Sequence, residues 1–261
     1  LGRPQAERLA FLESHPAETE SRDDLSIERI TLYNQLGRYE EAKALIAARK
    51  FHPWEGGEGK ITGQYTICHV ELAKIALREH RYADALALLQ ATDQYPYNLG
   101  EGKLINAEEN DIWYYKGLAY RGLGDEENAK LWLHKATQGS AEPQQAFFYN
   151  DAQPDKIFYQ GLALLKLNRM DEANGRFHKL TTYGEKHLFD KVKMDYFAVS
   201  LPDLLIWEDD LTIRNIIHCK YMMALGYWGL DQKEKSVRLL AEVERLDINH
   251  QGIQAFRSLI G

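Results

Sequence analysis

Few cysteines and no long hydrophobic run are present in the sequence. Two cysteines in 261 residues cannot form a disulfide framework, and both Cys68 and Cys219 lie in apolar stretches, where cysteine behaves as a small buried hydrophobe. The longest almost uncharged apolar run, 221–230, is too short for a membrane helix, which needs about 20 residues. We therefore expect no membrane partner and a cytoplasmic location.

Basic residues are also scarce relative to acidic ones. The 32 lysines and arginines face 39 acidic residues, which leaves a net charge of −7. Binding to a phosphate backbone needs a basic face, so nucleic acid is not expected as a partner. The chain begins at Leu1 instead of a methionine, and from this we expect a domain excised from a longer protein, with any targeting signals upstream.

One pattern occurs five times along the chain. An apolar-periodic helix is followed by a turn of glycine or polar residues and then by a charged-to-small step into a second apolar helix. The small residues that close the five copies are Ala42, Ala85, Ala129, Ala173 and Ser236. Their spacings are 43, 44, 44 and 63 residues, and this recurrence predicts pairs of helices that pack closely at each small side chain.

The third copy carries the clearest family resemblance. Trp113, Gly117 and Tyr120 lie on one helical face, and Ala129 stands where the second helix crosses the first. These residues resemble the tetratricopeptide repeat, a helical hairpin of about 34 residues. The resemblance implies an all-α fold, a right-handed α-α superhelix or solenoid of about five helical hairpins. Because the first three spacings exceed the family value by about ten residues and the last is longer still, we expect long connectors between the hairpins.

We expect the whole chain, residues 1–261, to form a single solenoid domain. The hairpins are expected at about 25–50, 64–93, 110–138, 155–182 and 215–248. Three further segments are expected: an N-terminal cap at 1–24, an inserted helical connector at 183–214 and a C-terminal cap helix at 251–261.

Two phrases, at 51–60 and 195–203, resemble those of one large uncharacterised bacterial family. In its members a C-terminal repeat half follows an N-terminal β-sandwich, mutarotase-like region. The resemblance implies that this chain is such a C-terminal half and that any carbohydrate chemistry lies mainly in the other half. It assigns no catalytic residue to this chain.

Two connectors end in Glu-Gly-Lys before a helix, at 58–60 and 101–103. Glycine permits a positive φ, and the N-terminus of a helix offers unpaired N–H groups that can hold an anion. One interpretation is that these residues only close equivalent turns, with the glutamate as a helix cap. The other is a ligand-binding site, with a sugar as the candidate ligand, built from His52, Trp54, Glu58, Lys60, Asn98, Glu101 and Lys103.

The first helix of every hairpin builds the concave face in tetratricopeptide arrays. The residues that the resemblance implies at this face are Asn34, Lys74, Tyr114, Arg121, Phe158 and Tyr221. Large aromatic residues and arginine are typical of interface hot spots, so this face is the first candidate for binding. The alternative is that the long connectors fold across the groove and bury these side chains.

No pattern indicates catalysis, a metal or a cofactor. The pairs at 68–69 and 218–219 join cysteine to histidine, but neighbours on a helix point about 100° apart and cannot easily chelate one ion. The acidic runs at 108–111 and 208–210 precede apolar helices, where acids complement the helix dipole. A general acid and base, as in a glycosidase, is the other interpretation of these runs.

Together these expectations indicate an interaction or interdomain scaffold that is not catalytic by itself. Its expected partner is a protein, a peptide or the N-terminal domains of the same parent chain. The alternative is an accessory part of a carbohydrate-active enzyme, in which the Glu-Gly-Lys loops contribute to a sugar-binding site.

Overall fold

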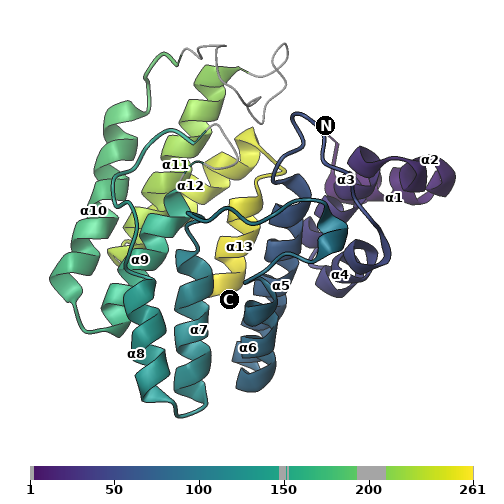
Figure 1. Cartoon of the computed structure of the whole chain (residues 1–261). Helices are drawn as coiled ribbons and strands as arrows, with labels where there is room; N and C mark the ends of the chain where they lie inside the picture. The colour runs from purple at the N-terminus through teal and green to yellow at the C-terminus, as the bar shows by residue number, and fades with distance from the viewer. Residues whose placement is uncertain (1–2, 147–150, 152, 193–209, 261) are drawn as a thin grey trace. The chain divides into compact units, whose positions relative to one another are not determined.

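The computed structural model describes residues 3–146, 151, 153–192 and 210–260, and these are helical with no strand (Figure 1). The all-α class expected from the sequence is confirmed. Most of the inserted connector expected at 183–214, including the phrase at 195–203 and two of the three acids at 208–210, lies outside the described residues. No helix of the described part is long and apolar enough to cross a bilayer.

The chain forms two compact units, and the boundary between them falls inside the last helix. The first unit comprises residues 1–107 and 254–261, and the second comprises residues 108–253. The first contains α1 (Gln5–Glu13), α2 (Pro16–Ser21), α3 (Asp23–Gln35), α4 (Tyr39–Ala48), α5 (Lys60–Arg78), α6 (Tyr82–Ala91) and the 3₁₀ turn η1 (Tyr97–Leu99). The second contains α7 (Asn110–Gly122), α8 (Glu126–Lys135), α9 (Pro154–Lys166), α10 (Met170–His187), α11 (Leu211–Gly229) and α12 (Lys233–Leu246). The last helix is α13 (Gln251–Ile260).

Five helical hairpins are present among the described residues, as the repeat pattern predicts: α3–α4, α5–α6, α7–α8, α9–α10 and α11–α12. Each turn has one residue in the left-handed region, two positions after the first helix ends. These residues are Gly37, His80, Gly124, Asn168 and Asp231, with φ between 57° and 80°. The next residue donates its N–H to a carbonyl in the last turn of the helix, for example Asp125 to Tyr120 at 3.0 Å. This is the Schellman arrangement, which explains why polar and glycine residues recur at the turns.

The small residue that closes each repeat is fully buried. Ala42, Ala85, Ala129, Ala173 and Ser236 are all 0% exposed. In the third hairpin the space is so limited that a Cβ on Gly117 would stand 2.7 Å from Leu133 and 3.2 Å from the carbonyl oxygen of Ala129. The prediction that small side chains mark close helix crossings is therefore confirmed.

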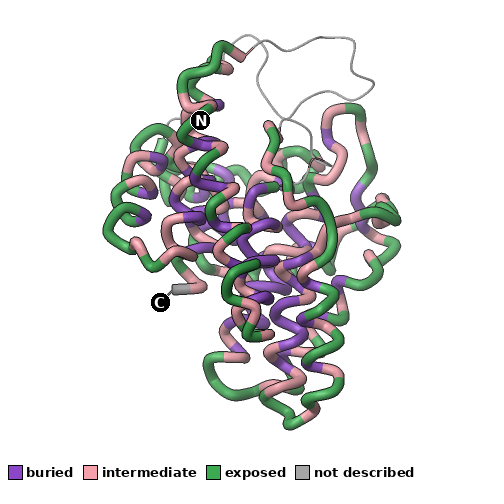
Figure 2. Tube along the Cα trace, turned by 90° about the vertical axis from the view of Figure 1, so that its left-hand side faces the viewer, coloured by how far each residue is buried: buried purple, intermediate pink, exposed green. Residues whose placement is uncertain are grey.

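In the second unit the first helices of successive hairpins contact each other, α7 with α9 and α9 with α11. They form one layer, and each second helix packs against the first helix of the next hairpin, α8 on α9 and α10 on α11. Buried residues follow the contacts between helices in the tube view (Figure 2). Side chains on the layer formed by α7, α9 and α11 therefore come together from different repeats.

Asparagine side chains hold the ends of several helices. Asn98 donates to the carbonyl oxygens of Ile46 and Arg49 at the end of α4, at 2.7 and 2.8 Å. Asn110 donates to Ala136 at 2.9 Å, after α8, and Asn215 donates to His187 at 2.8 Å, at the end of α10. These bonds satisfy carbonyl groups that have no partner within their own helix.

Candidate functional site

The two Glu-Gly-Lys connectors lie together in the first unit. The backbone N–H of Phe51 donates to the carbonyl oxygen of Asn98 at 2.7 Å. Phe51 and Leu99 are only 1% and 0% exposed, so each connector places one apolar side chain in the core. The core of this unit thus includes residues from the connectors as well as from the hairpins.

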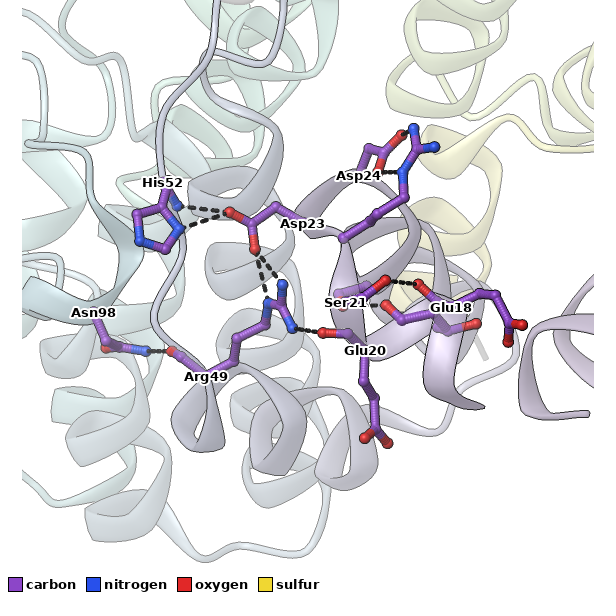
Figure 3. A network of polar contacts seen from close by, with 11 residues as sticks. Glu18, Glu20, Ser21, Asp23, Asp24, Arg49, His52 and Asn98 are labelled. Carbon is purple, nitrogen blue, oxygen red and sulfur yellow. Dashed lines mark hydrogen bonds and ion pairs between the residues drawn. The ribbon is translucent and has the colours of Figure 1, made fainter. Parts of the chain in front are cut away.

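Asp23 ties the first connector to the start of α3 (Figure 3). Its Oδ1 accepts from Nε and Nη2 of Arg49 at 2.8 and 2.5 Å, and its Oδ2 accepts from the backbone N–H of His52 at 2.9 Å. Burial raises the pKa of Asp23, but the hydrogen bonds from Arg49 and His52 outweigh burial and hold this pKa below its ordinary value. The carboxylate is therefore a structural link, which the sequence analysis did not identify.

The acidic residues of the two loops contact backbone N–H groups. Glu58 accepts from Gly56 at 2.8 Å within its own turn. Glu101 accepts at 2.8 Å from Gly59, the residue that precedes α5, and so occupies a position where a helix N-terminus could otherwise hold an anion. Burial, and then the negative charge of Glu58, raise the pKa of Glu101 despite the bond from Gly59. These are the contacts of turn closure and helix capping.

The remaining loop residues also have defined places. The Trp54 ring covers Gly57, where an added Cβ would stand 2.2 Å from the ring. Lys103 donates to the carbonyl oxygen of Thr92, just after α6, at 2.8 Å. His52 and Lys60 are exposed.

The helix-face residues predicted from the repeat pattern fall in both units. In the first unit Asn34 and Lys74 are each 3% exposed, and Asn34 donates to the side chain and the carbonyl oxygen of Gln64 at 2.9 and 3.1 Å. Lys74 bonds to Glu71 and to the carbonyl oxygen of Ala255. Asn34 therefore links α3 to α5, and Lys74 links α5 to α13.

In the second unit three of the four predicted residues are buried. Tyr114 is 5%, Phe158 1% and Tyr221 7% exposed. Tyr114 packs on Tyr159 with ring centroids 5.7 Å apart, and the hydroxyl of Tyr221 donates to the carbonyl oxygen of Gly252 at 3.1 Å. These tyrosines belong to the layer of first helices in this unit.

Arg121 lies apart from this set, at the C-terminal end of α7. Its side chain is 34% exposed and is 3.5 Å from Glu126.

A set of charged and aromatic residues on the layer formed by α7, α9 and α11 was not identified from the sequence. We call it the acidic–tyrosine cluster, and its members are Asp111, Tyr115, Asp155, Lys156, Tyr159 and Tyr221.

One lysine of this cluster forms ion pairs with two carboxylates. Nζ of Lys156 is 2.6 Å from Asp111 and 3.7 Å from Asp155. The side chains of Asp111, Lys156 and Asp155 are 14%, 19% and 29% exposed. In the described part of the chain, Lys156 is the one cation in ion-pair contact with either carboxylate. The group thus keeps one negative charge in excess.

The pKa values of these three groups are displaced by burial and by each other. Burial raises the pKa of Asp155, and the neighbouring Asp111 raises it further, against the opposing effect of Lys156. Burial alone lowers the pKa of Lys156, but Asp111 and Asp155 outweigh it and raise this pKa above its ordinary value. Lys156 therefore stays charged, whereas ionised Asp155 lies in an unfavourable place.

The tyrosines complete the cluster. The hydroxyl oxygens of Tyr115 and Tyr159 are 3.0 Å apart, so one donates to the other. Burial raises the pKa of Tyr159 and of Tyr221, and for Tyr221 the charges of Asp155 and Asp111 raise it further. The hydroxyls of Tyr159 and Tyr221 therefore stay protonated at neutral pH, and that of Tyr221 already donates to the carbonyl oxygen of Gly252.

The repeat interval could have revealed this cluster. Tyr115 and Tyr159 are 44 residues apart, which is the spacing between the third and fourth repeats, and the same interval separates Asp111 from Asp155. Equivalent positions of neighbouring repeats lie on one face. Polar residues at matching positions of neighbouring repeats are therefore a sequence signal of such a cluster.

The cysteines are buried, and the described residues contain no group of three or more potential metal ligands. Burial raises the pKa of Cys68 to about 12 and that of Cys219 to about 11. Both thiols are therefore protonated and poorly reactive at neutral pH.

No family model matches the chain. Among solved structures it is similar to that of YrrB, described as a TPR protein with an unusual peptide-binding site, with 13% identity over 94% of this chain and 97% of that chain and a TM-score of 0.33. It is also similar to BtubC (BKLC) from P. vanneervenii, with 12% identity over 93% of this chain and 86% of that chain and a TM-score of 0.36. At these TM-scores the assignment of the fold rests on the helical hairpins of the chain itself.

Proposed function

We propose that this chain is a protein-interaction module, not catalytic by itself, whose acidic–tyrosine cluster receives a basic side chain of a polypeptide partner. The observation that carries the proposal is that Lys156 is the shared ion-pair partner of two partly buried carboxylates, Asp111 and Asp155. A lysine or arginine of a partner would neutralise the excess negative charge and donate hydrogen bonds to both acids.

The cluster is not needed for the closure of the hairpins. Close packing of α7 on α8 uses Gly117, Ala129 and Leu133. Placing two carboxylates near one lysine costs desolvation free energy, which well-packed apolar residues would avoid. Groups that are unfavourable for stability and lie together on one face are typical of functional sites.

Aromatic residues provide the second component of the proposed surface. Tyrosine is enriched among interface hot spots because it combines a large apolar ring with a hydroxyl group. Tyr114 and Tyr221, predicted from the repeat pattern, are 5% and 7% exposed, and we propose that they support the contact surface from beneath. Phe158, in the same unit, is proposed as a supporting residue of this surface. Asn34 and Lys74 lie in the first unit and Arg121 lies at the C-terminal end of α7, so they are not included in it.

Selection from a peptide library tests this function. A phage-displayed library is panned against the chain, and the affinities of selected peptides are measured by calorimetry. We expect the peptides to share a lysine or arginine, and Asp155→Asn to weaken their binding by at least 10-fold. Asp171→Asn, an exposed acid on α10, is the matched control and should leave affinity unchanged. Peptides that lack basic residues, or that bind Asp155→Asn as tightly as the parent, would contradict the proposal.

The candidate partners include the N-terminal β-sandwich region that the family resemblance implies for a longer parent chain. A pull-down with that region tests whether it binds this chain, and the selected peptides can be added to test whether they compete with it. Calorimetry with mono- and oligosaccharides covers the carbohydrate alternative. Saccharide binding that disappears in a Trp54→Ala, Glu58→Ala double variant would favour a sugar-binding role for the connector loops instead.

A further inference from the structure

One segment of the second unit is held through its main chain. Residues 138–146, which lie between α8 and α9 in the chain, form neither helix nor strand, and most of them are exposed. None of them is among the buried core residues. Burial of apolar side chains therefore contributes little to holding this segment in place.

Gln160 of α9 binds the main chain of the segment. Its Nε2 donates to the carbonyl oxygens of Gln138 and Ser140 at 3.1 and 2.8 Å. Nε of Arg176, on α10, donates to Oε1 of Gln160 at 3.0 Å, which directs Nε2 toward the segment. Gln160 is 0% exposed, so its amide depends on these partners for its hydrogen bonds.

Two further side chains bind the same main chain. Glu108, just before α7, accepts from the backbone N–H of Ser140 at 2.9 Å, and Nε2 of His218, on α11, donates to the carbonyl oxygen of Gln144 at 2.8 Å. Ser140 and Gln144 are four residues apart, and four extended residues span about 13 Å. This is enough to pass from α9 to α11, because the axes of packed helices lie about 8–10 Å apart. Side chains from three consecutive repeats therefore bind one extended stretch.

These contacts demand little of the side chains in the segment, because every polypeptide carries the backbone groups that they bind. The one strict position is Gly139, which has a φ of 97° and where an added Cβ would stand 2.8 Å from Oε1 of Glu108. The ion pair of Glu142 with Lys179 joins side chains that are 76% and 39% exposed, so it contributes little. The surface thus selects an extended chain with glycine before the residue that binds Glu108.

The segment leaves part of this surface unused. Oε2 of Glu108 is buried and has no hydrogen-bond donor among the described residues. A buried acceptor without a donor costs free energy, which a better ligand would recover by supplying the donor. Residues 138–146 are therefore an exchangeable occupant more than a fixed part of the core.

We infer that Glu108, Gln160 and His218 form a binding site for the main chain of an extended polypeptide, and that residues 138–146 occupy this site within the chain. The partner is an extended segment of another protein, with glycine at the position of Gly139, and it binds by displacing residues 138–146. The inference concerns other residues than the acidic–tyrosine cluster and does not depend on it.

The test uses the full chain and a fluorescein-labelled peptide of residues 136–146 as the probe. Gly139→Val in the chain places a β-branched side chain at a φ of 97° and against Glu108, so the attached segment should leave the site. By fluorescence anisotropy we expect this variant to bind the peptide at least 10-fold more tightly than the parent, in which the attached segment competes. Gly37→Val is the matched control, at a glycine with a φ of 74° and nothing within 4 Å of an added Cβ, and should bind as the parent does.

Changes in the peptide test whether the main chain is recognised. N-methylation at Ser140 removes the N–H that Glu108 accepts and should weaken binding to the Gly139→Val chain at least 10-fold. N-methylation at Gln145, whose N–H has no acceptor among the described residues, should leave affinity unchanged.

Two further variants of the chain identify the site. Adding Gln160→Leu to Gly139→Val should abolish the gain, because it removes the donor to two carbonyl groups. If Gly139→Val fails to fold, Ser140→Pro, which removes the N–H of the attached segment that Glu108 accepts, should still increase peptide affinity several-fold.

The inference is overturned if peptide affinity is the same in the parent, Gly139→Val and Ser140→Pro chains. It is also overturned if the peptide methylated at Ser140 binds as tightly as the unmodified one, or if the gain survives Gln160→Leu, because the peptide would then bind elsewhere.

Discussion

Replacing Gly161 by alanine tests the close packing on which the hairpins depend. A Cβ at this position would stand 2.3, 2.6 and 3.0 Å from three atoms of the Phe177 ring. The ring is 0% exposed and cannot move aside, because a Cβ on Gly229 would also stand 2.3 Å from it. The added methyl group must therefore displace α9 from α10.

The sign of the effect follows from two opposing contributions. Alanine gains about 1 kcal/mol over glycine inside a helix. Overpacking of a rigid core costs about 1–3 kcal/mol, and contact with a clamped aromatic ring belongs at the upper end. We therefore expect Gly161→Ala to lower the free energy of unfolding by about 2 kcal/mol.

Two other glycines serve as controls. Gly175 lies in α10 with nothing within 4 Å of an added Cβ, so Gly175→Ala should stabilise the chain by about 1 kcal/mol. At Gly117 the methyl group meets the side chain of Leu133 at 2.7 Å, and this side chain can adjust, so the effect should be intermediate.

Urea unfolding followed by far-UV circular dichroism gives the three free energies. The expected order of stability is Gly175→Ala, then Gly117→Ala, then Gly161→Ala. A Gly161→Ala chain at least as stable as the wild type would refute the argument that glycine is required where α9 crosses α10.

Three further predictions concern titratable groups. Asp155→Asn should stabilise the chain at pH 7, because burial raises the pKa of Asp155. In thermal melts this gain should begin to shrink as the pH falls to the raised pKa and should be gone below the unfolded value of about 3.9. Asp23→Asn should cost about 1–3 kcal/mol at pH 7. Since the pKa of Asp23 is lowered in the folded chain, its contribution is present above the unfolded pKa of about 3.9 and is lost as the pH falls through the folded value, so melts of variant and parent should converge in acid. Cys68 and Cys219, both 0% exposed with raised pKa values, should not react with a disulfide reagent at pH 8 until the chain is unfolded, and rapid labelling of the native chain would show that they are accessible.

Much of the local structure could be predicted from the sequence because it depends on local rules. The positions of Ala85, Ala129 and Ala173 identified where paired helices cross, and all three are fully buried. Polar and glycine residues at the turns supply the left-handed conformation that ends each first helix, as at Gly124 and Asn168.

The candidate sites were harder to predict because burial and charge depend on neighbours that are distant in sequence. Asp111 was interpreted as one acid of a run that either complements a helix dipole or supplies a general acid or base, yet it contacts Lys156, 45 residues further along the chain. A residue-by-residue interpretation misses such a contact, whereas a comparison of equivalent repeat positions reveals the face on which it lies.

The sequence by itself determined the helical hairpins, because small residues, turn residues and apolar periodicity act within one repeat. Only the tertiary structure decided what covers each helix face. The contact of Arg78 with Ser258 joins residues 180 positions apart, and no local pattern specifies it. Such contacts form only when segments that are distant in sequence pack together within one unit, and they determine which charged side chains are buried.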